Sequence, residues 1–451
     1  MNHQDTIAAV ATPAGRGGVG IVRVSGPGVS SISQSVVGCS LIPRQATFTD
    51  FLDGSGDVID QGLALYFKSP ASFTGEDVLE LQGHGGPIVM SLLLSRVVSL
   101  GARIARPGEF SERAFLNEKL DLSQAEAVAD LIDSTTEAAA RGAIRSLKGV
   151  FSDRVRALDI SIVKLRMFVE AAIDFPEEEI DFLSDDRLKD NLELALTQMR
   201  TLTQQTHQGA ILREGITLVL VGEPNAGKSS LMNQFVGDDI SIVTAMPGTT
   251  RDVIREYISL GGVPLKLVDT AGLREAENEI EAEGVRRARA EMLAADGVLV
   301  VIDAAKDSDW VSQTTHLLAG LEAQPAVFVA LNKIDIASEL PEALVPSPYH
   351  ATRVSAKTGA GIGDLKTALL NQFAPNVTTE SNFIARSRHV DALKRAEEHL
   401  MTGRQVLLEQ SAGELFAEEL RYCHEALIEI TGEFTSDDLL GEIFSTFCIG
   451  K

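Results

Sequence analysis

The sequence predicts a protein of several domains: an α+β module at the N-terminus, an α-helical bundle, and an α/β P-loop domain inserted into that bundle. The chain of 451 residues is long enough for roughly three domains. A phosphate-loop pattern near the middle of the chain lies between a buried strand and a helix. Helical periodicity flanks this region on both sides, and a self-contained domain whose ends lie close together suits such an insertion.

Composition and the first residues argue against a membrane protein, a secreted protein and a protein with a cysteine metal site. Hydrophobic residues make up 44% of the sequence, which is ample for buried cores, yet no run approaches the ~20 apolar residues of a membrane helix. The first residues carry no basic region followed by an apolar stretch, so no signal peptide is expected. Cys39, Cys423 and Cys448 have neither metal-ligand spacing nor a close pairing, as in proteins of a reducing compartment. We therefore expect a cytoplasmic protein that does not enter a membrane.

The chain is strongly acidic. Its formal net charge of −24 argues against general nucleic-acid binding, because phosphate neutralisation provides most of that affinity. If RNA is the substrate, a local basic patch or a basic partner must hold it.

The N-terminal part of the chain, up to about residue 117, alternates short β-type runs with turns. Strands are expected at residues 6–11, 20–25, 63–67 and 78–82. Pro87 at a first helical position and Gly101 beyond the last predict a helix between them, whereas the glycines of residues 83–86 predict a flexible turn. Arg23 and Glu80 fall inside apolar strands, where a functional role and the polar face of an amphipathic strand are equally open.

Beyond this module the pattern becomes helical. Ser123 and Glu126 have the spacing of a capping box, and apolar residues then recur at helical spacing to Leu147. Gly209 is expected to end a later helix. The further helices are expected at residues 151–173, 185–207, 388–408, 414–430 and 437–447. The two helical halves are expected to pack as one domain, because neither could bury its apolar faces well alone.

The phosphate-loop pattern occupies residues 222–229, with the sequence Gly-Glu-Pro-Asn-Ala-Gly-Lys-Ser. The run 216–221 before it reads as a buried strand, and residues 230–235 after it as the first turns of a helix. Such a turn aims backbone N–H groups at one point, with the helix dipole behind them, and that point suits a diphosphate. Lys228 is expected to reach the β- and γ-phosphates, and the Ser229 hydroxyl to ligate Mg²⁺.

Later segments complete a nucleotide site. Asp269 ends a predicted strand over residues 265–269 and is placed like the acid that holds Mg²⁺ through water, while the N–H of Gly272 can face a γ-phosphate. Core strands follow at residues 298–303 and 326–331.

The second of these core strands leads into the base-recognition segment, Asn332, Lys333 and Asp335. The Asp335 carboxylate can accept from two adjacent ring N–H groups of guanine, and adenine cannot offer both. After a short strand at residues 353–354, the base can be covered by Ser355, Ala356 and Lys357. Order and spacing therefore predict GTP rather than ATP.

The catalytic part of the site departs from a Ras-like enzyme. Leu273 occupies the place of the water-positioning Gln and can neither orient water nor take a proton. Candidate replacements are the acids just downstream, most of which we expect in a solvated acidic loop. These acids are Glu275, Glu277, Glu279 and Glu281. The side-chain oxygen of Asn225 could hold a cation beside the transferred phosphate, in the role of an arginine finger.

With these motifs in place, the whole chain resembles the MnmE family of tRNA modification GTPases, also called TrmE. The resemblance lies in five short motifs. They are Asp-Thr-Ile-Ala-Ala at residues 5–9, Phe-Thr-Gly-Glu-Asp at 73–77, Pro-Gly-Glu-Phe at 107–110, Lys-Leu-Asp-Leu at 119–122 and Cys-Ile-Gly-Lys at 448–451. It covers the chain essentially end to end, and the assignment to tRNA comes from it alone. We expect a tetrahydrofolate-binding-like dimerisation domain at residues 1–117 and a GTPase domain at residues 211–375. The two halves of a helical domain are expected at residues 118–210 and 376–451.

The resemblance implies a homodimer formed through the N-terminal domain. The residues that match positions around the folate, a 5-formyl- or methylene-tetrahydrofolate, are Arg23, Glu80, Lys119 and Lys451. Cys448 matches the family's tail cysteine and is placed among the catalytic candidates with its role left open.

The resemblance also implies a partner, the FAD- and NADH-using protein MnmG (GidA), in a heterotetramer. Together such proteins add an aminomethyl or carboxymethylaminomethyl group at C5 of the wobble uridine, position 34, of certain tRNAs. The carbon comes from methylene-tetrahydrofolate. The flavoprotein is expected to supply the basic surface that this chain lacks.

In this family the GTPase domains pair across their nucleotides and K⁺ assists hydrolysis. The K⁺ ligands implied are the side chain of Asn225 and the backbone carbonyls of Thr244, Met246 and Thr249. Thr250 matches the switch threonine on Mg²⁺, Glu281 the glutamate that positions water indirectly, and Arg274 lies in the same switch and could couple hydrolysis to modification. The complete set of expected GTP contacts is Asn225, Ala226, Gly227, Lys228, Ser229, Ser230, Thr244, Thr249, Thr250, Asp269, Gly272, Asn332, Lys333, Asp335, Ser355, Ala356 and Lys357.

One loop departs from the family pattern and leaves an alternative open. Residues 245–248 read Ala-Met-Pro-Gly, where the family often has Asp-Ile-Ala-Gly, and the proline biases Met246 toward extended geometry. Ribosome-assembly GTPases share Pro-Gly-Thr-Thr, so a regulatory GTPase without modification chemistry is the alternative; such proteins usually carry a basic RNA-binding domain, which this sequence does not show. A folate-binding protein with a vestigial GTPase conflicts with the intact Lys228, Ser229 and Asp335.

Overall fold

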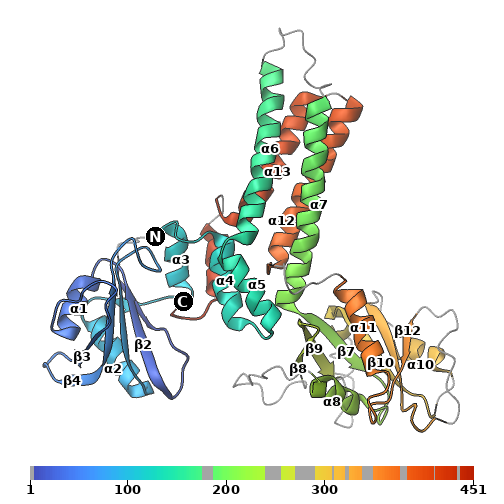
Figure 1. The fold of residues 1–451 in the computed structure, drawn as a ribbon, viewed down its shortest axis with the longest axis horizontal. Helices are drawn as coiled ribbons and strands as arrows, with labels where there is room; N and C mark the ends of the chain where they lie inside the picture. The colour runs from blue at the N-terminus through green and yellow to red at the C-terminus, as the bar shows by residue number, and fades with distance from the viewer. Residues whose placement is uncertain are drawn as a thin grey trace. The chain divides into compact units, whose positions relative to one another are not determined.

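The computed structural model describes residues 5–174, 186–238, 255–269, 290–306, 309–319, 325–337, 349–375, 383–410, 412–433 and 437–450. Figure 1 shows the ribbon. The chain forms two compact units. One comprises Met1–Ala129, Ser146–Met199 and Ala392–Lys451, and the other Asp130–Arg145 and Arg200–Asp391.

A six-stranded sheet in the order β3-β4-β5-β2-β1-β6 forms the N-terminal module. Its strands are β1 (Ile7–Val10), β2 (Gly17–Ser25), β3 (Thr47–Leu52), β4 (Val58–Phe67), β5 (Val78–Gly85) and β6 (Arg103–Ile104), and its helices are α1 (Val29–Val37), α2 (Pro87–Ser99) and α3 (Glu109–Leu116). Alternate residues of β2 and β5, such as Val24 and Leu79, are buried in one core with α1 and α2. Because strand side chains alternate between faces, Arg23 and Glu80 lie on the other face, directly opposite each other in the register.

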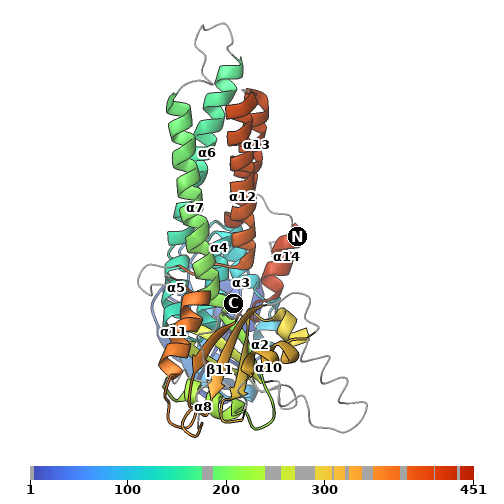
Figure 2. The same ribbon diagram turned by 90° about the vertical axis from the view of Figure 1, so that its right-hand side faces the viewer.

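The helical region is built from both ends of the chain. Its helices are α4 (Leu122–Asp133), α5 (Glu137–Leu147), α6 (Val150–Asp174), α7 (Asp186–Glu214), α12 (Ser387–Gln405), α13 (Gly413–Thr431) and α14 (Asp437–Ser445), with a π-helix η3 at Val406–Gln410. Figures 1 and 2 show α6, α7, α12 and α13 side by side, and Asp159 of α6 bonds His424 of α13 at 2.6 Å. The prediction of helices on both sides of the α/β region is confirmed. Among the described helices, none is long and apolar enough to cross a bilayer.

The inserted α/β region is a doubly wound sheet in the order β12-β11-β10-β7-β9-β8, in which β8 alone is antiparallel to its neighbour. Its strands are β7 (Ile216–Val221), β8 (Arg255–Leu260), β9 (Val263–Asp269), β10 (Gly297–Asp303), β11 (Ala326–Asn332) and β12 (His350–Arg353). Both faces are buried, one in a core with α8 (Lys228–Asp238) and α11 (Ile362–Phe373), the other in a core that includes Trp310 of α10 (Trp310–Leu317) (Figure 2). The strands predicted at residues 216–221, 265–269, 298–303 and 326–331 are confirmed, whereas the short strand predicted at residues 353–354 lies earlier, at His350–Arg353. Strand β7 lies at the switch point of the sheet.

One buried carboxylate joins the two connections of this inserted region. Asp130 of α4 accepts from Arg213 near the end of α7 and from Arg386 just before α12, both at 2.8 Å. Its side chain is 6% exposed, so both ionic hydrogen bonds are largely shielded from water. The chain therefore leaves the helices for β7 and returns to them at the same point.

Four local predictions about helix caps, helix ends and glycines were wrong, each for a physical reason. The capping box of α4 is formed by Asp121 and Gln124, which exchange N–H to side-chain bonds of 2.9 Å in both directions. Ser123 and Glu126 lie inside the helix. The helical run to Leu147 is broken, because α4 ends at Asp133 and Thr136 caps α5 by accepting from the Ala139 N–H at 3.1 Å.

The glycines of residues 83–86 and 209 were also misread. Strand β5 continues to Gly85, where it pairs with Gly17, because paired glycines allow the two backbones to lie close. Helix α7 passes through Gly209, at which a Cβ would lie 2.5 Å from the Phe383 carbonyl oxygen, and ends before Gly215. Gly209 thus serves close packing rather than chain termination.

Candidate functional site

The phosphate-loop pattern forms the connection between β7 and α8. A Cβ on Gly222 would lie 2.4 Å from the Val301 carbonyl oxygen, and one on Gly227, whose φ is +100°, would lie 2.3 Å from Nδ2 of Asn332. Both positions therefore require glycine. Lys228 is 7% exposed and its Nζ donates to the carbonyl oxygens of Gly222 at 2.9 Å and Glu223 at 3.0 Å. The amine thus lies within the loop that should hold the phosphates.

Asn332, at the end of β11, connects this loop to the predicted base-covering loop. Its Nδ2 donates to the Ala226 carbonyl oxygen and its Oδ1 accepts from the Ala356 N–H, both at 2.9 Å. The side chain is 1% exposed. Because both ends of the amide are satisfied, Asn332 fixes the spacing between the two loops.

The base-recognition segment is held from two sides. The Ser355 hydroxyl, in the loop that follows β12, donates to Oδ1 of Asp335 at 2.7 Å. Asp335 itself is exposed at the protein surface. Lys333, whose φ is +66°, pairs through Nζ with Asp303 at 2.6 Å. Asp303 was not predicted as a site residue, although an acid at the carboxyl end of a core strand is the signal that identified Asp269.

The residues on the phosphate side fit a Mg-nucleotide. Asp269 is buried at the end of β9, while Ser229 and Ser230 are exposed in the first turn of α8, and hydroxyl and carboxylate oxygens are the ligands that Mg²⁺ prefers. Asn225 has a φ of +63°, a region that asparagine enters more readily than most residues. The remaining predicted contacts lie outside the described residues: Thr244, Met246, Thr249, Thr250, Gly272, Arg274 and Glu281.

A second candidate site lies on the open face of the N-terminal sheet. Arg23 pairs with Glu80 through Nε at 3.0 Å and Nη2 at 2.9 Å. The guanidinium also lies 5.6 Å from the ring centroid of Phe73 and 5.7 Å from that of Phe110. Its side chain is 23% exposed, so the pair is sheltered but open to a ligand.

The C-terminal tail reaches this site from the other end of the chain. Ile449 forms an isolated β-bridge with Pro107, and the carbonyl oxygen of Gly450 lies 3.5 Å from Nη1 of Arg23. Gly450 has a φ of +97°, and a Cβ there would lie 2.6 Å from the Val10 carbonyl oxygen. Cys448 is exposed. The structure thus brings Cys448 and the Arg23–Glu80 pair into one region, while Lys451 lies outside the described residues.

Lys119 belongs to the same region. It is exposed just after α3, and a Cβ on Gly75 would lie 3.2 Å from its Cγ. Gly75 belongs to the loop that carries Phe73. The lysine is therefore adjacent to the segment that contacts Arg23.

Comparisons with known proteins agree with this architecture. The profile described as "GTP-binding protein TrmE N-terminus" matches residues 6–119, and that of the "MnmE helical domain" matches residues 122–448. A relative from Coxiella burnetii named "tRNA modification GTPase MnmE" is 54% identical over 455 residues, covering 99% of this chain and 99% of its own. Relatives of the same name from Chromohalobacter salexigens, 53% identical over 453 residues, and Proteus mirabilis, 52% over 454, cover at least 99% of both chains.

The chain belongs to the MnmE family. The predicted resemblance is confirmed, as is the fold class of an α+β N-terminal domain, a helical domain and a P-loop α/β domain.

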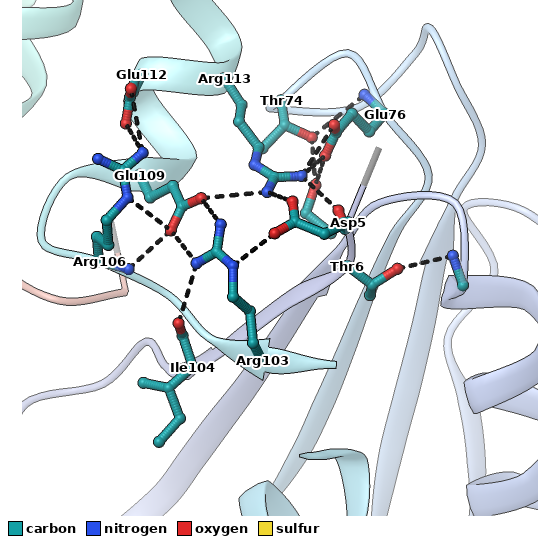
Figure 3. Close-up of polar contacts among 12 residues, drawn as sticks. Asp5, Thr6, Thr74, Glu76, Arg103, Ile104, Arg106, Glu109, Glu112 and Arg113 are labelled. Carbon is teal, nitrogen blue, oxygen red and sulfur yellow. Dashed lines mark hydrogen bonds and ion pairs between the residues drawn. The ribbon is translucent and has the colours of Figure 1, made fainter. Parts of the chain in front are cut away.

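Behind the N-terminal site of this MnmE-family chain lies a network of ion pairs that the sequence did not predict (Figure 3). Arg113 of α3 is 3% exposed and bonds Asp5, Glu76 and Glu109 at 2.6 to 3.1 Å. Arg103 bonds Asp5 and Glu109 as well, both at 2.5 Å. Three of these residues fall within the quoted family signatures, which was the available signal.

Electrostatics in this network favour the ionised forms. Burial alone would raise the pKa of Glu109, but hydrogen bonds from Arg103, the Arg106 N–H and Arg113 outweigh it and leave the pKa below its ordinary value. For Asp5, burial likewise acts upward, and the bonds from Arg103 and Arg113 lower the pKa overall. The carboxylates therefore stay charged at neutral pH.

Proposed function

We propose that this chain is a GTP-hydrolysing enzyme of tRNA modification that works in the cytoplasm. The observation that carries the proposal is the similarity along the full chain, at 54% identity, to relatives named tRNA modification GTPase MnmE. The geometry of the phosphate loop and of the base-recognition segment supports GTP binding. The reaction is the addition of an aminomethyl or carboxymethylaminomethyl group at C5 of uridine 34 in certain tRNAs, carried out in a heterotetramer with the flavoprotein MnmG, which uses FAD and NADH.

The inserted domain, residues 211–375, binds GTP in this proposal. Lys228 exchanges its loop carbonyls for the β- and γ-phosphates, and Asp335, positioned by Ser355, accepts from the guanine ring. Ser229 and Thr250 hold Mg²⁺, which neutralises charge on the phosphate oxygens. Glu281 positions the attacking water, and Arg274 couples the switch to modification.

A potassium ion completes the proposed nucleotide site. Its ligands are Asn225 and the carbonyl oxygens of Thr244, Met246 and Thr249. The left-handed backbone of Asn225 supports an unusual role for that residue, because such a conformation persists where the surroundings require it.

The N-terminal domain, residues 1–117, holds a tetrahydrofolate derivative and forms the homodimer. Arg23, Glu80, Lys119 and Lys451 contact the folate, and Cys448 takes part in the modification. The docking of the tail beside Arg23 supports this assignment, because it brings the two ends of the chain together. Residues 118–210 and 376–451 form the helical domain that joins the two sites.

The deciding experiment has two arms. Steady-state GTP hydrolysis is measured in KCl and in NaCl at equal ionic strength, with Asn225→Ala as the control that should lose the difference. Separately, the gene is expressed in a bacterium that lacks its own MnmE, and nucleosides of its tRNA are analysed for modified uridine 34. Equal rates in both salts would contradict the proposed potassium site. Hydrolysis without restored modification of uridine 34 would favour a regulatory GTPase.

A further inference from the structure

The loop between β4 and β5 carries the aromatic ring that contacts Arg23, and its position depends on Glu76. The Glu76 carboxylate accepts both contacts from Arg113 at 3.1 Å and a third, from the Ser25 hydroxyl, at 2.7 Å. Ser25 lies on β2, two residues beyond Arg23, and its hydroxyl also lies 2.7 Å from that of Thr74. The loop is thus tied both to α3 and to the strand that bears Arg23.

Arg113 joins this loop to the second aromatic contact. Its guanidinium also bonds Glu109, and the next residue of α3 is Phe110, whose ring centroid lies 5.7 Å from the Arg23 guanidinium. The rings at 5.6 and 5.7 Å therefore belong to two segments that Arg113 holds together (Figure 3 shows the bonds). Planar guanidinium geometry allows one residue to do this, because its N–H groups form a rigid fork.

The carboxylates of this network differ in how many arginines contact them. Asp5 and Glu109 keep a second arginine, Arg103, if Arg113 is lost. Among the described residues, Arg113 is the one cation that contacts Glu76. Loss of the Arg113 fork therefore removes the ion pair that ties Glu76 of the 72–77 loop to α3, whereas loss of Arg103 leaves that ion pair in place.

We infer that Arg113 and Glu76 are positioning residues for the N-terminal cofactor site, acting through Phe73 to set the place of the Arg23 guanidinium against Glu80. The inference rests on the proposed folate function. The ligand class it fits is a flat reduced pteridine, with Phe73, 37% exposed, as an apolar wall beside the Arg23–Glu80 pair. Neither positioning residue needs to touch the ligand.

The test compares two arginines of one network. Binding of 5-formyl-tetrahydrofolate to the full-length protein is measured by calorimetry for the wild type, Arg113→Lys, Glu76→Gln and Arg103→Lys, and the Tm of each is recorded. Arg113→Lys should weaken binding about tenfold or more, since a small displacement of a contact group is costly, and Glu76→Gln several-fold. Arg103→Lys should lower Tm and leave the affinity within about twofold.

The outcomes separate the inference from the function on which it rests. If the wild type does not bind the ligand, the folate assignment fails. If the wild type binds and Arg113→Lys binds equally well, or if affinity follows Tm across all variants including Arg103→Lys, the positioning role is overturned. GTP affinity, measured alongside, should not change in any variant, because the nucleotide residues belong to a different compact unit.

Discussion

In the inserted domain, the candidate site residues follow the carboxyl ends of parallel strands, and the side chains that hold the phosphate loop bond to backbone atoms of that loop and its neighbour. Asn332 and Lys228 both do so. In the N-terminal domain, side chains bond to side chains, as in Arg23 with Glu80 and Arg113 with Glu76. A backbone-based site follows from chain order and fold, whereas a side-chain network requires each of its members to be present.

Lys228→Ala should have the largest effect and tests the backbone-based site. The substitution removes the one charge that this loop can direct at the β- and γ-phosphates, so steady-state GTP hydrolysis should fall by about 100-fold or more. Lys306→Ala, which removes an exposed lysine of the same compact unit that has no assigned contact with the nucleotide, is the matched control and should cost little. Retention of a fifth of the wild-type rate by Lys228→Ala would contradict the site.

Asp335→Asn should change base preference rather than abolish binding. The amide oxygen can still accept from Ser355, so the loop remains in place, but the paired acceptor for guanine is lost. GTP affinity should fall by roughly 100-fold and xanthosine triphosphate should bind better than GTP, as measured by competition with a fluorescent nucleotide. No gain for the xanthine nucleotide would show that Asp335 does not read the base.

Gly450→Ala tests the side-chain site through the docked tail. The added Cβ would lie 2.6 Å from the Val10 carbonyl oxygen at a φ of +97°, so the tail should leave its place at a cost on the order of 1–3 kcal/mol. Affinity for 5-formyl-tetrahydrofolate should fall several-fold while GTP hydrolysis is unchanged. Gly441→Ala is the control, since a Cβ there meets nothing within 4 Å; equal affinities for both variants would separate the tail from the site.

Acid should affect the side-chain network, and this is the smallest effect expected. Asp5 and Glu109 have pKa values below their ordinary ones, so the stability they contribute is present above the ordinary pKa of about 4 and is lost as the pH falls through the folded-state values. Tm should therefore fall more steeply below about pH 4 in the wild type than in Glu109→Gln. Parallel curves for the two proteins would mean that Glu109 does not contribute in this way.

Much of the nucleotide site followed from the sequence alone. Strand β7 and the glycines of the loop were predicted because strand, turn and helix signals are local. The role of Asn332 in joining two loops was not, because the two backbone groups it bonds belong to residues 226 and 356. Pairings over such separations depend on the completed sheet.

The N-terminal site was less accessible to prediction. Arg23 and Glu80 were noticed as charges within apolar strands, but their assignment to a ligand depended on the family resemblance. Arg23 and Glu80 lie opposite each other because of the register in which β2 pairs with β5. The alternation of apolar residues along each strand does not determine which residues of the two strands are paired. The signatures at residues 73–77 and 107–110 were visible as motifs; their reason, the bonds of Glu76 and Glu109 to Arg113, required coordinates.

The Asp130 contacts bear on how such a protein could change over evolution. Arg213 and Arg386 secure both crossings of the chain to one carboxylate. A nearby bond from the Ser387 N–H to the Glu214 carboxylate joins residues that are 173 positions apart in the sequence. The entropy of closing a loop grows only slowly with its length, so a longer or shorter segment between these crossings would place little extra burden on the helices. The junction thus acts as a fixed frame within which a whole module can be lengthened, trimmed or exchanged.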